Sequence, residues 1–209
     1  EKRGEGNLRP RLVHRLDRET SGVVVLAKTV EAERALREAF DGGRVTKRYL
    51  ALVDGEYDLE EGARGTIDLP IGPDRKKSGR MWVDEDGGKP ARTEVAIERR
   101  FRGFTLLDCR PLTGRTHQIR VHLAATGFPL AVDSVYGHRR ALALSELKPG
   151  YRRKPGRPES PLIDRLTLHA SSLEFPAPDG GGPLRVEAPV PADLARALKQ
   201  LAKVRSPRP

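Results

Sequence analysis

Apolar residues along this chain occur mostly in short runs and in alternating patterns, which are typical of β-strands. Two of these runs, 92–101 and 104–111, are separated only by Arg102–Gly103, a spacing that predicts a β-hairpin. The β-branched run "VVVLAK" at 23–28 predicts a buried strand. Strands are therefore expected at 23–28, 45–55, 92–101, 104–111 and 166–175.

Three segments have the apolar spacing and the end signals of helices. The first covers 29–40, with Thr29 as N-cap and Gly42–Gly43 beyond its end. The others cover 116–127, stopped by Gly127, and 191–204, with Pro191 at its start. Few helices among runs of strands predict an α+β fold, with a mixed, mainly antiparallel central sheet flanked by those helices.

The chain is strongly basic, and this changes the picture of its partners. Its 209 residues carry a formal net charge of +10, and the pI is near 10.1. Such a charge favours binding to polyanions, because lysine and arginine neutralise phosphates and release counterions. Two basic segments rich in glycine and proline, 72–80 and 137–160, are expected to be loops. They either contact phosphates or are simply solvated charge runs.

Chain length, apolar runs and cysteine content limit the classes of protein to which this chain could belong. No apolar run approaches the ~20 residues that cross a bilayer. The single cysteine, Cys109, excludes an internal disulfide and fits a reducing, cytoplasmic location. No internal boundary is evident, so we expect a single domain over 1–209. We also expect a monomer.

Several common kinds of site lack support in the sequence. Among the five histidines, His117 and His122 are five residues apart and would not share a helix face, so a zinc site is not expected. A serine hydrolase built on Ser21 lacks the G-x-S-x-G elbow. The glycine patterns of nucleotide-binding loops are also missing.

Asp17 is the most unusual carboxylate of the chain. It lies between Arg15 and Arg18, in a polar corner "DRETSG" that leads into the run at 23–28. A carboxylate among guanidinium groups stays ionised and can act as a nucleophile or a base. Arg120, in "GRTHQIRVHLA", is a second candidate partner for it. A structural salt bridge would account for the same residues.

Four segments, in order along the chain, resemble the RluA-type pseudouridine synthases. "HRLDRETSG" (14–22) is similar to that family's aspartate signature, and "GRTHQIRVHLAATGFPLAVDSVYG" (114–137) to its second signature. "TKRYLALV" (46–53) resembles the segment that carries the active-site tyrosine. "LTLHASSLEF" (166–175) resembles a segment late in the domain.

The resemblance implies the pseudouridine synthase fold and the isomerisation of a uridine already within a structured RNA. It implies Asp17 as the catalytic nucleophile, Tyr49 against the uracil, and Arg120 paired with Asp17. It further implies that Arg15 enters the RNA stack when the target base leaves and that Leu168 forms part of an apolar wall.

The donor-rich start of the second signature is expected to bind the same RNA, through Arg115 and His117. No metal or cofactor is implied, since the reaction has no net redox change. Transfer RNA and large-subunit ribosomal RNA both remain open as substrates. A non-catalytic RNA-binding or ribosome-assembly protein with the same fold is the alternative.

The sequence departs from the family in three places. Only 16 residues precede Asp17, so the usual N-terminal strands of the domain are expected to be missing. An S4-like domain is not expected either. Val132 occupies a position where relatives commonly have glycine, which predicts a small local change of the backbone.

Overall fold

The computed structural model describes residues 9–60, 62–152 and 156–207, and its centre is a seven-stranded sheet. Six of its strands follow one another edge to edge with antiparallel pairing, and a short strand, β2 (Ser21–Gly22), pairs in parallel with β10. The edge-to-edge order is β11 (Pro183–Glu187), β10 (Leu168–Pro176), β4 (Thr46–Asp54), β9 (Phe104–Pro111), β8 (Arg92–Phe101) and β5 (Arg64–Asp68).

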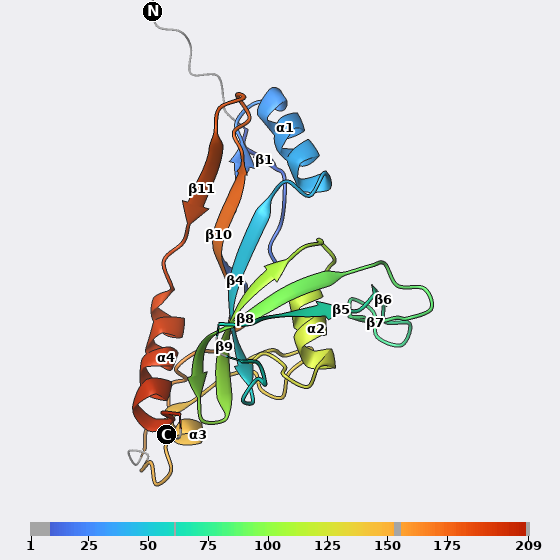
Figure 1. Ribbon diagram of the computed structural model, residues 1–209. Helices are drawn as coiled ribbons and strands as arrows, with labels where there is room; N and C mark the ends of the chain where they lie inside the picture. Colours follow the sequence, from blue (N-terminus) through green and yellow to red (C-terminus); the bar gives the residue numbers. More distant parts are fainter. Residues whose placement is uncertain (1–8, 61, 153–155, 208–209) are drawn as a thin grey trace, which may run out of the picture.

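Four helices accompany the sheet in the described part of the chain: α1 (Val30–Asp41), α2 (Gln118–Ala125), α3 (Leu144–Leu147) and α4 (Ala192–Val204). Figure 1 shows α1 at one end of the elongated molecule and α3 and α4 at the other. The predicted α+β class with a mainly antiparallel sheet is therefore confirmed.

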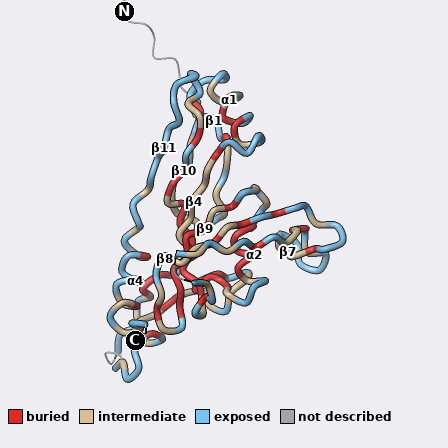
Figure 2. Tube along the Cα trace, in the orientation of Figure 1, coloured by how far each residue is buried: buried red, intermediate tan, exposed pale blue. Residues whose placement is uncertain are grey.

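The two central strands bury a different set of residues on each face, as the two-residue period of a strand requires. Leu52 of β4 packs in the cluster that contains Leu194 and Leu201 of α4. Its neighbour Val53 packs in the cluster that contains Leu123 of α2, on the other face. Buried residues accordingly run along β4, β9 and α2, whereas β11 is exposed (Figure 2). Tyr49 belongs to the face that α2 covers.

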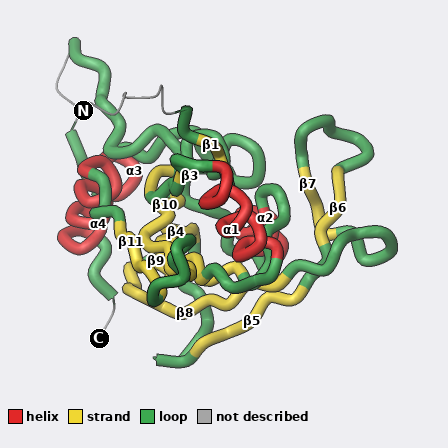
Figure 3. Tube along the Cα trace, turned by 90° about the horizontal axis from the view of Figure 1, so that it is seen from above, coloured by secondary structure: helices red, strands yellow, loops and turns green. Residues whose placement is uncertain are grey.

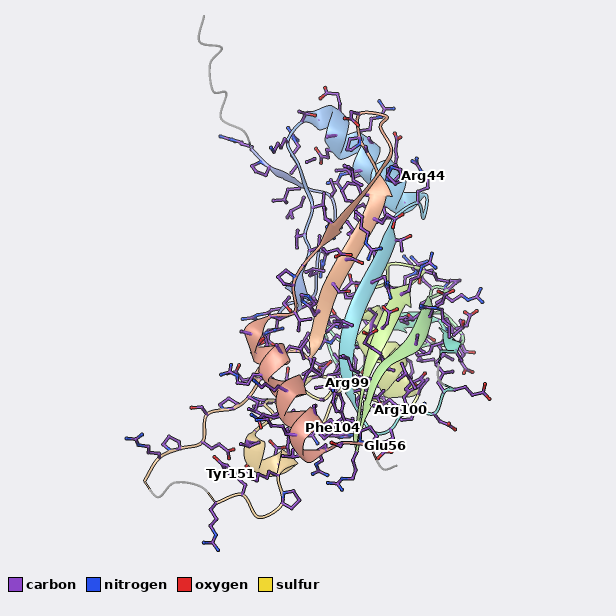
Figure 4. All side chains as sticks on the ribbon, turned by 60° about the vertical axis from the view of Figure 1, so that its left-hand side comes forward. Arg44, Glu56, Arg99, Arg100, Phe104 and Tyr151 are labelled. Carbon is purple, nitrogen blue, oxygen red and sulfur yellow. The ribbon has the colours of Figure 1, made fainter. Side chains whose placement is uncertain are left out.

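Several predicted elements form with nearly the expected bounds. The β8–β9 hairpin turns at Arg102–Gly103, and Gly103 has a φ of +79°, which suits glycine. Thr29 caps α1 by accepting a hydrogen bond from the backbone N–H of Ala32 at 3.2 Å. Figure 4 shows Glu56 and Phe104 near the turn of this hairpin and Arg44, which follows α1, at the opposite end of the molecule.

The prediction of a buried strand at 23–28 is wrong. Only Leu26–Ala27 is a strand, β3, and it pairs with β1 (Arg11–Leu12) outside the central sheet. Of this run only Ala27 is buried, because the segment lies over the surface beside α1. Val23 and Val25 pack against the cluster that contains Leu36, whereas Val24 between them is exposed.

The strands β5 and β11 of the central sheet were not predicted from the sequence, and neither was a separate hairpin formed by β6 (Ile71–Pro73) and β7 (Met81–Val83). Strands β6 and β7 flank the basic loop expected at 72–80, and the hairpin projects away from the central sheet (Figure 3). The second predicted loop, 137–160, contains α3 and two fully buried leucines, Leu142 and Leu147, so it is anchored in the core. Residues 153–155 of this loop lie outside the described residues.

Within the described ranges, none of the helices is long and apolar enough to cross a membrane.

Candidate active site

Asp17 opens a tight turn. The backbone N–H of Thr20 donates to the Asp17 carbonyl at 3.0 Å, and the third residue of the turn, Glu19, has a φ of +70°. This left-handed backbone costs energy in a residue other than glycine and is characteristic of segments held in place by their surroundings. The turn is followed by β2, which pairs with β10 and so ties the Asp17 segment to the sheet.

Gly22 makes this attachment close. Its φ is +126°, and a Cβ on it would lie 2.2 Å from the carbonyl oxygen of Ala170. Only glycine therefore allows β2 to approach β10 so tightly. The pairing of β2 with β10 therefore requires glycine at position 22, the end of the "DRETSG" corner. This pairing holds the Asp17 segment beside the sheet.

Arg120 of α2 lies beneath Asp17 and is almost fully buried. Its Nη1 donates to Asp17 Oδ2 at 3.4 Å. Its Nε and Nη2 donate to the two carboxylate oxygens of Asp133 at 2.7 and 2.9 Å. The bidentate pair with Asp133 is the shorter and better formed, so Asp133 fixes the guanidinium and leaves one edge of it for Asp17.

Charges reinforce this arrangement. Burial would lower the pKa of Arg120, but the hydrogen bonds and charges of Asp133 and Asp17 raise it above its ordinary value. Burial would raise the pKa of Asp133, but Arg120 and the backbone N–H groups of Val135 and Tyr136 hold it below its ordinary value. Both members of the buried pair are therefore ionised at neutral pH.

Tyr136 connects this pair to His117. Its ring lies 4.9 Å from the Arg120 guanidinium carbon, a cation–π distance. Its hydroxyl accepts from the Met81 backbone N–H at 2.8 Å and lies 2.9 Å from His117 Nδ1. Burial lowers the pKa of His117, which favours the neutral ring. His117 itself has a φ of +56°, immediately before α2.

Tyr49 and Leu168 come from adjacent strands, β4 and β10. Burial, together with the negative charge of Asp17, raises the pKa of Tyr49 to about 12. The phenol is therefore protonated at neutral pH. The Asp17 carboxylate therefore lies close enough to the phenol to disfavour its phenolate form.

These side chains line one cleft of about 530 Å³, within the size range of small-molecule sites. The cleft is lined by six of the seven residues singled out from the sequence: Arg15, Asp17, Tyr49, Arg115, His117 and Leu168. Arg120 is not among the lining residues, but it reaches one of them, Asp17, through its Nη1. The structure thus brings together residues that are as far apart as 15 and 168 in the sequence.

Two important residues, Asp133 and Tyr136, were missed by reasoning from the sequence. Both lie in "PLAVDSVYG", three residues apart. This stretch belongs to the second signature, but the resemblance assigned no role to either residue. The available signal was a single carboxylate among apolar residues, and a buried carboxylate requires a cationic partner. Lys47 and Thr113 also line the cleft without having been singled out.

Ser21, the serine of the hydrolase alternative, is not among the residues that line this cleft. Its hydroxyl lies 3.0 Å from His169 Nδ1 and accepts from Arg165 Nη1 at 3.1 Å. Arg165 in turn pairs with Asp193 of α4 at 2.7 Å. This network joins β2 and β10 to α4, so Ser21 has a structural explanation.

Comparison with known proteins gives a consistent picture. A family model described as RNA pseudouridylate synthase matches residues 1–125. The uncharacterized RNA pseudouridine synthase YlyB of Bacillus subtilis is 39% identical over 198 residues, which are 95% of this chain and 58% of that protein. Ribosomal large subunit pseudouridine synthase C of Escherichia coli is 39% identical over 196 residues, 93% of this chain and 57% of that protein.

Ribosomal large subunit pseudouridine synthase D of Xanthomonas campestris is 41% identical over 197 residues, 91% of this chain and 54% of that protein. The chain thus spans somewhat more than half the length of these relatives. Among solved structures, human RNA pseudouridylate synthase domain containing 1 superposes with a TM-score of 0.71 at 30% identity, over 95% of this chain and 74% of that one.

Proposed function

This chain belongs to the RluA-type RNA pseudouridylate synthase family, and on that basis we propose that it converts uridine to pseudouridine within RNA, with Asp17 as the nucleophile. The observation that carries the proposal is the setting of Asp17. Its carboxylate faces a cleft large enough for a nucleotide, and a buried arginine, itself fixed by Asp133, holds it from behind.

The reaction rearranges bonds without any external group. The C1′–N1 glycosidic bond breaks, the uracil turns, C5 bonds to C1′, and the C5 proton is transferred to N1, so that substrate and product are isomers. An ionised carboxylate can assist by attacking the sugar at C1′ or the base. Arg120 orients Asp17 for either attack, since its Nη1 donates to Asp17 Oδ2 at 3.4 Å.

Tyr49 contributes a flat face against the uracil. Because its pKa is about 12, it is not a resting base at neutral pH. The Asp17 charge is one of the two causes of that pKa, so consumption of the charge in a covalent intermediate lowers it. We therefore assign to Tyr49 a part in removal of the C5 proton only after Asp17 has reacted.

The remaining lining residues receive the displaced nucleotide. A stacked uridine hides its reacting atoms, so the enzyme flips it out of the helix at a cost of a few kcal/mol. Arg15, which is exposed at the cleft, takes the vacated place in the stack. Leu168 packs against the uracil, and Arg115 and His117 contact the RNA around it.

Large-subunit ribosomal RNA is the substrate that we favour, because two of the similar proteins are named as ribosomal large subunit pseudouridine synthases. Transfer RNA is the second candidate. Either substrate would place the protein in the cytoplasm. The net charge of +10 supplies general attraction to RNA phosphates but does not select among RNAs.

Nucleoside analysis tests the proposal. Unmodified large-subunit ribosomal RNA and transfer RNA, transcribed in vitro, would be incubated with the chain or with Asp17→Ala, digested, and separated by chromatography. We expect pseudouridine with the parent chain and none with Asp17→Ala. RNA that is bound by the parent chain but contains no pseudouridine would contradict the proposal and favour a non-catalytic RNA-binding protein.

A further inference from the structure

Lys47 lines the same cleft as Tyr49 but has no part in the reaction described so far. The two residues are two positions apart on β4, so their side chains leave the same face of the sheet. One such repeat of a strand spans about 7 Å. The ammonium group is therefore close to the uracil position but offset from it along the cleft.

The surroundings of Lys47 leave its charge uncompensated. The Nζ donates to the backbone carbonyl of Thr113 at 3.1 Å. Within the described ranges no carboxylate lies near enough to form an ion pair with it. Burial lowers the pKa of Lys47, and its charge in turn contributes to the lowered pKa of His14 beside it. A half-hidden ammonium without a counter-ion is costly, and an anionic ligand removes that cost.

The cleft is open to such a ligand at this point. A Cβ on Gly114 would meet only the Lys47 Nζ, at 3.8 Å, so the loop after β9 presents bare backbone there. Besides Asp17, the lining contains one further carboxylate, that of Asp41, which is exposed. Arg115 and Arg15 are the other charged residues of the wall besides Asp17.

We propose that Lys47 binds one of the two phosphodiesters that flank the target uridine. The inference rests on the proposed function, since it takes the uracil to lie against Tyr49. A lysine binds phosphate as a compact point charge and requires no particular base. The contact therefore holds the RNA backbone in register while the base is out of the stack, and it adds affinity without adding sequence preference.

Nuclear magnetic resonance titration with small probes tests this directly. The probes are uridine, uridine 5′-monophosphate, uridine 3′-monophosphate and uridine 3′,5′-bisphosphate. For the parent chain we expect the bisphosphate to bind about tenfold more tightly than uridine. In Lys47→Met this gain disappears, in Lys47→Arg much of it remains, and the two monophosphates identify which phosphate is bound. Lys199→Met, which removes an exposed lysine of α4, keeps the full gain.

A purely structural role of Lys47 would change the affinities for uridine and for the bisphosphate alike, and so leave their ratio intact. An equal ratio in the parent chain and Lys47→Met would overturn the inference, as would a parent chain that gains nothing from the phosphates. The proposed function is judged separately, by pseudouridine formation and its loss in Asp17→Ala. A chain that forms pseudouridine with an unchanged ratio in Lys47→Met refutes the role of Lys47 alone.

Discussion

Arg120 divides its guanidinium between two carboxylates, and the unequal division explains how Asp17 is positioned. The short bonds to Asp133 fix the arginine inside the protein, and the longer contact at 3.4 Å reaches Asp17 at the cleft. The sequence motifs indicated the pair of Arg120 with Asp17. They did not assign Asp133 as the partner of Arg120, because that contact depends on how the segment after α2 folds back.

Asp133→Asn tests the importance of this anchor. The change leaves a buried guanidinium without its main counter-ion, and we expect a loss of about 3–5 kcal/mol in the free energy of unfolding. Denaturant unfolding measures it. Glu38→Gln, in the exposed Arg34–Glu38 pair of α1, is the matched control and changes stability by less than about 1 kcal/mol. Equal stability of Asp133→Asn and the parent chain would show that the anchor is dispensable.

Tyr49→Phe separates the ring of Tyr49 from its hydroxyl. If the hydroxyl takes part in the proton transfer that follows attack by Asp17, turnover falls by about 10²-fold or more while KM stays within a few-fold. Steady-state kinetics on an RNA substrate measure both. Unchanged turnover in Tyr49→Phe, together with a large loss in Tyr49→Ala, would limit Tyr49 to packing against the base.

At the scale of elements, long strands and helices with clear end signals were predictable from the sequence. The β8–β9 hairpin and α1 have the expected limits because local turn and capping residues define them. The prediction of a buried strand at 23–28 was wrong because β-branched residues also occur in segments that pack only one side against a core. The two-residue strand β2 had no signal of its own, since its pairing with β10 is purely tertiary.

Gly22→Ala tests the link between β2 and β10. A Cβ at this position meets the Ala170 backbone, so we expect a loss of about 1–3 kcal/mol from backbone strain. A shift of the Asp17 segment by about 1 Å would lower turnover about 10²-fold. Gly182→Ala, in an exposed turn where a Cβ meets nothing within 4 Å, is the control and keeps both properties. A fully active Gly22→Ala would show that this close approach does not position Asp17.

At the scale of the whole molecule, three histidines couple stability to pH. Burial lowers the pKa values of His14, His117 and His122 from 6.5. The unfolded chain therefore binds more protons than the folded chain just below that pH, and the free energy of unfolding decreases as the pH falls from 7 to 5. The folded protein is therefore more stable at neutral pH than at mildly acidic pH, because these histidines are neutral in the folded state.

Urea unfolding at several pH values measures this decrease. His122, which is fully buried between Thr93 and the Leu69 carbonyl, contributes part of it, so His122→Gln makes the dependence shallower. Stability that is constant or rises between pH 7 and 5 would contradict the assignment.

The cleft is a property of the whole molecule, because segments far apart in the sequence form it. Its lining comes from the segment before β2, from the end of α1 and the residues that follow it, from β4, from the loop after β9 with the start of α2, and from β10. Family motifs marked most of these residues individually, but periodicity and charge alone could not have brought them together. The volume of the cleft, the buried anchor of Arg120 and the position of Lys47 are properties of the folded chain.

Release of tritium from RNA labelled at C5 of uridine tests the central claim most directly. The parent chain and Asp17→Asn would be compared under single-turnover conditions, with RNA binding measured in the same samples. The account predicts that both bind the RNA, that the parent releases tritium as C5 bonds to the sugar, and that Asp17→Asn releases none. Equal release by both would contradict the role of Asp17, and binding without release by the parent would contradict the enzymatic function itself.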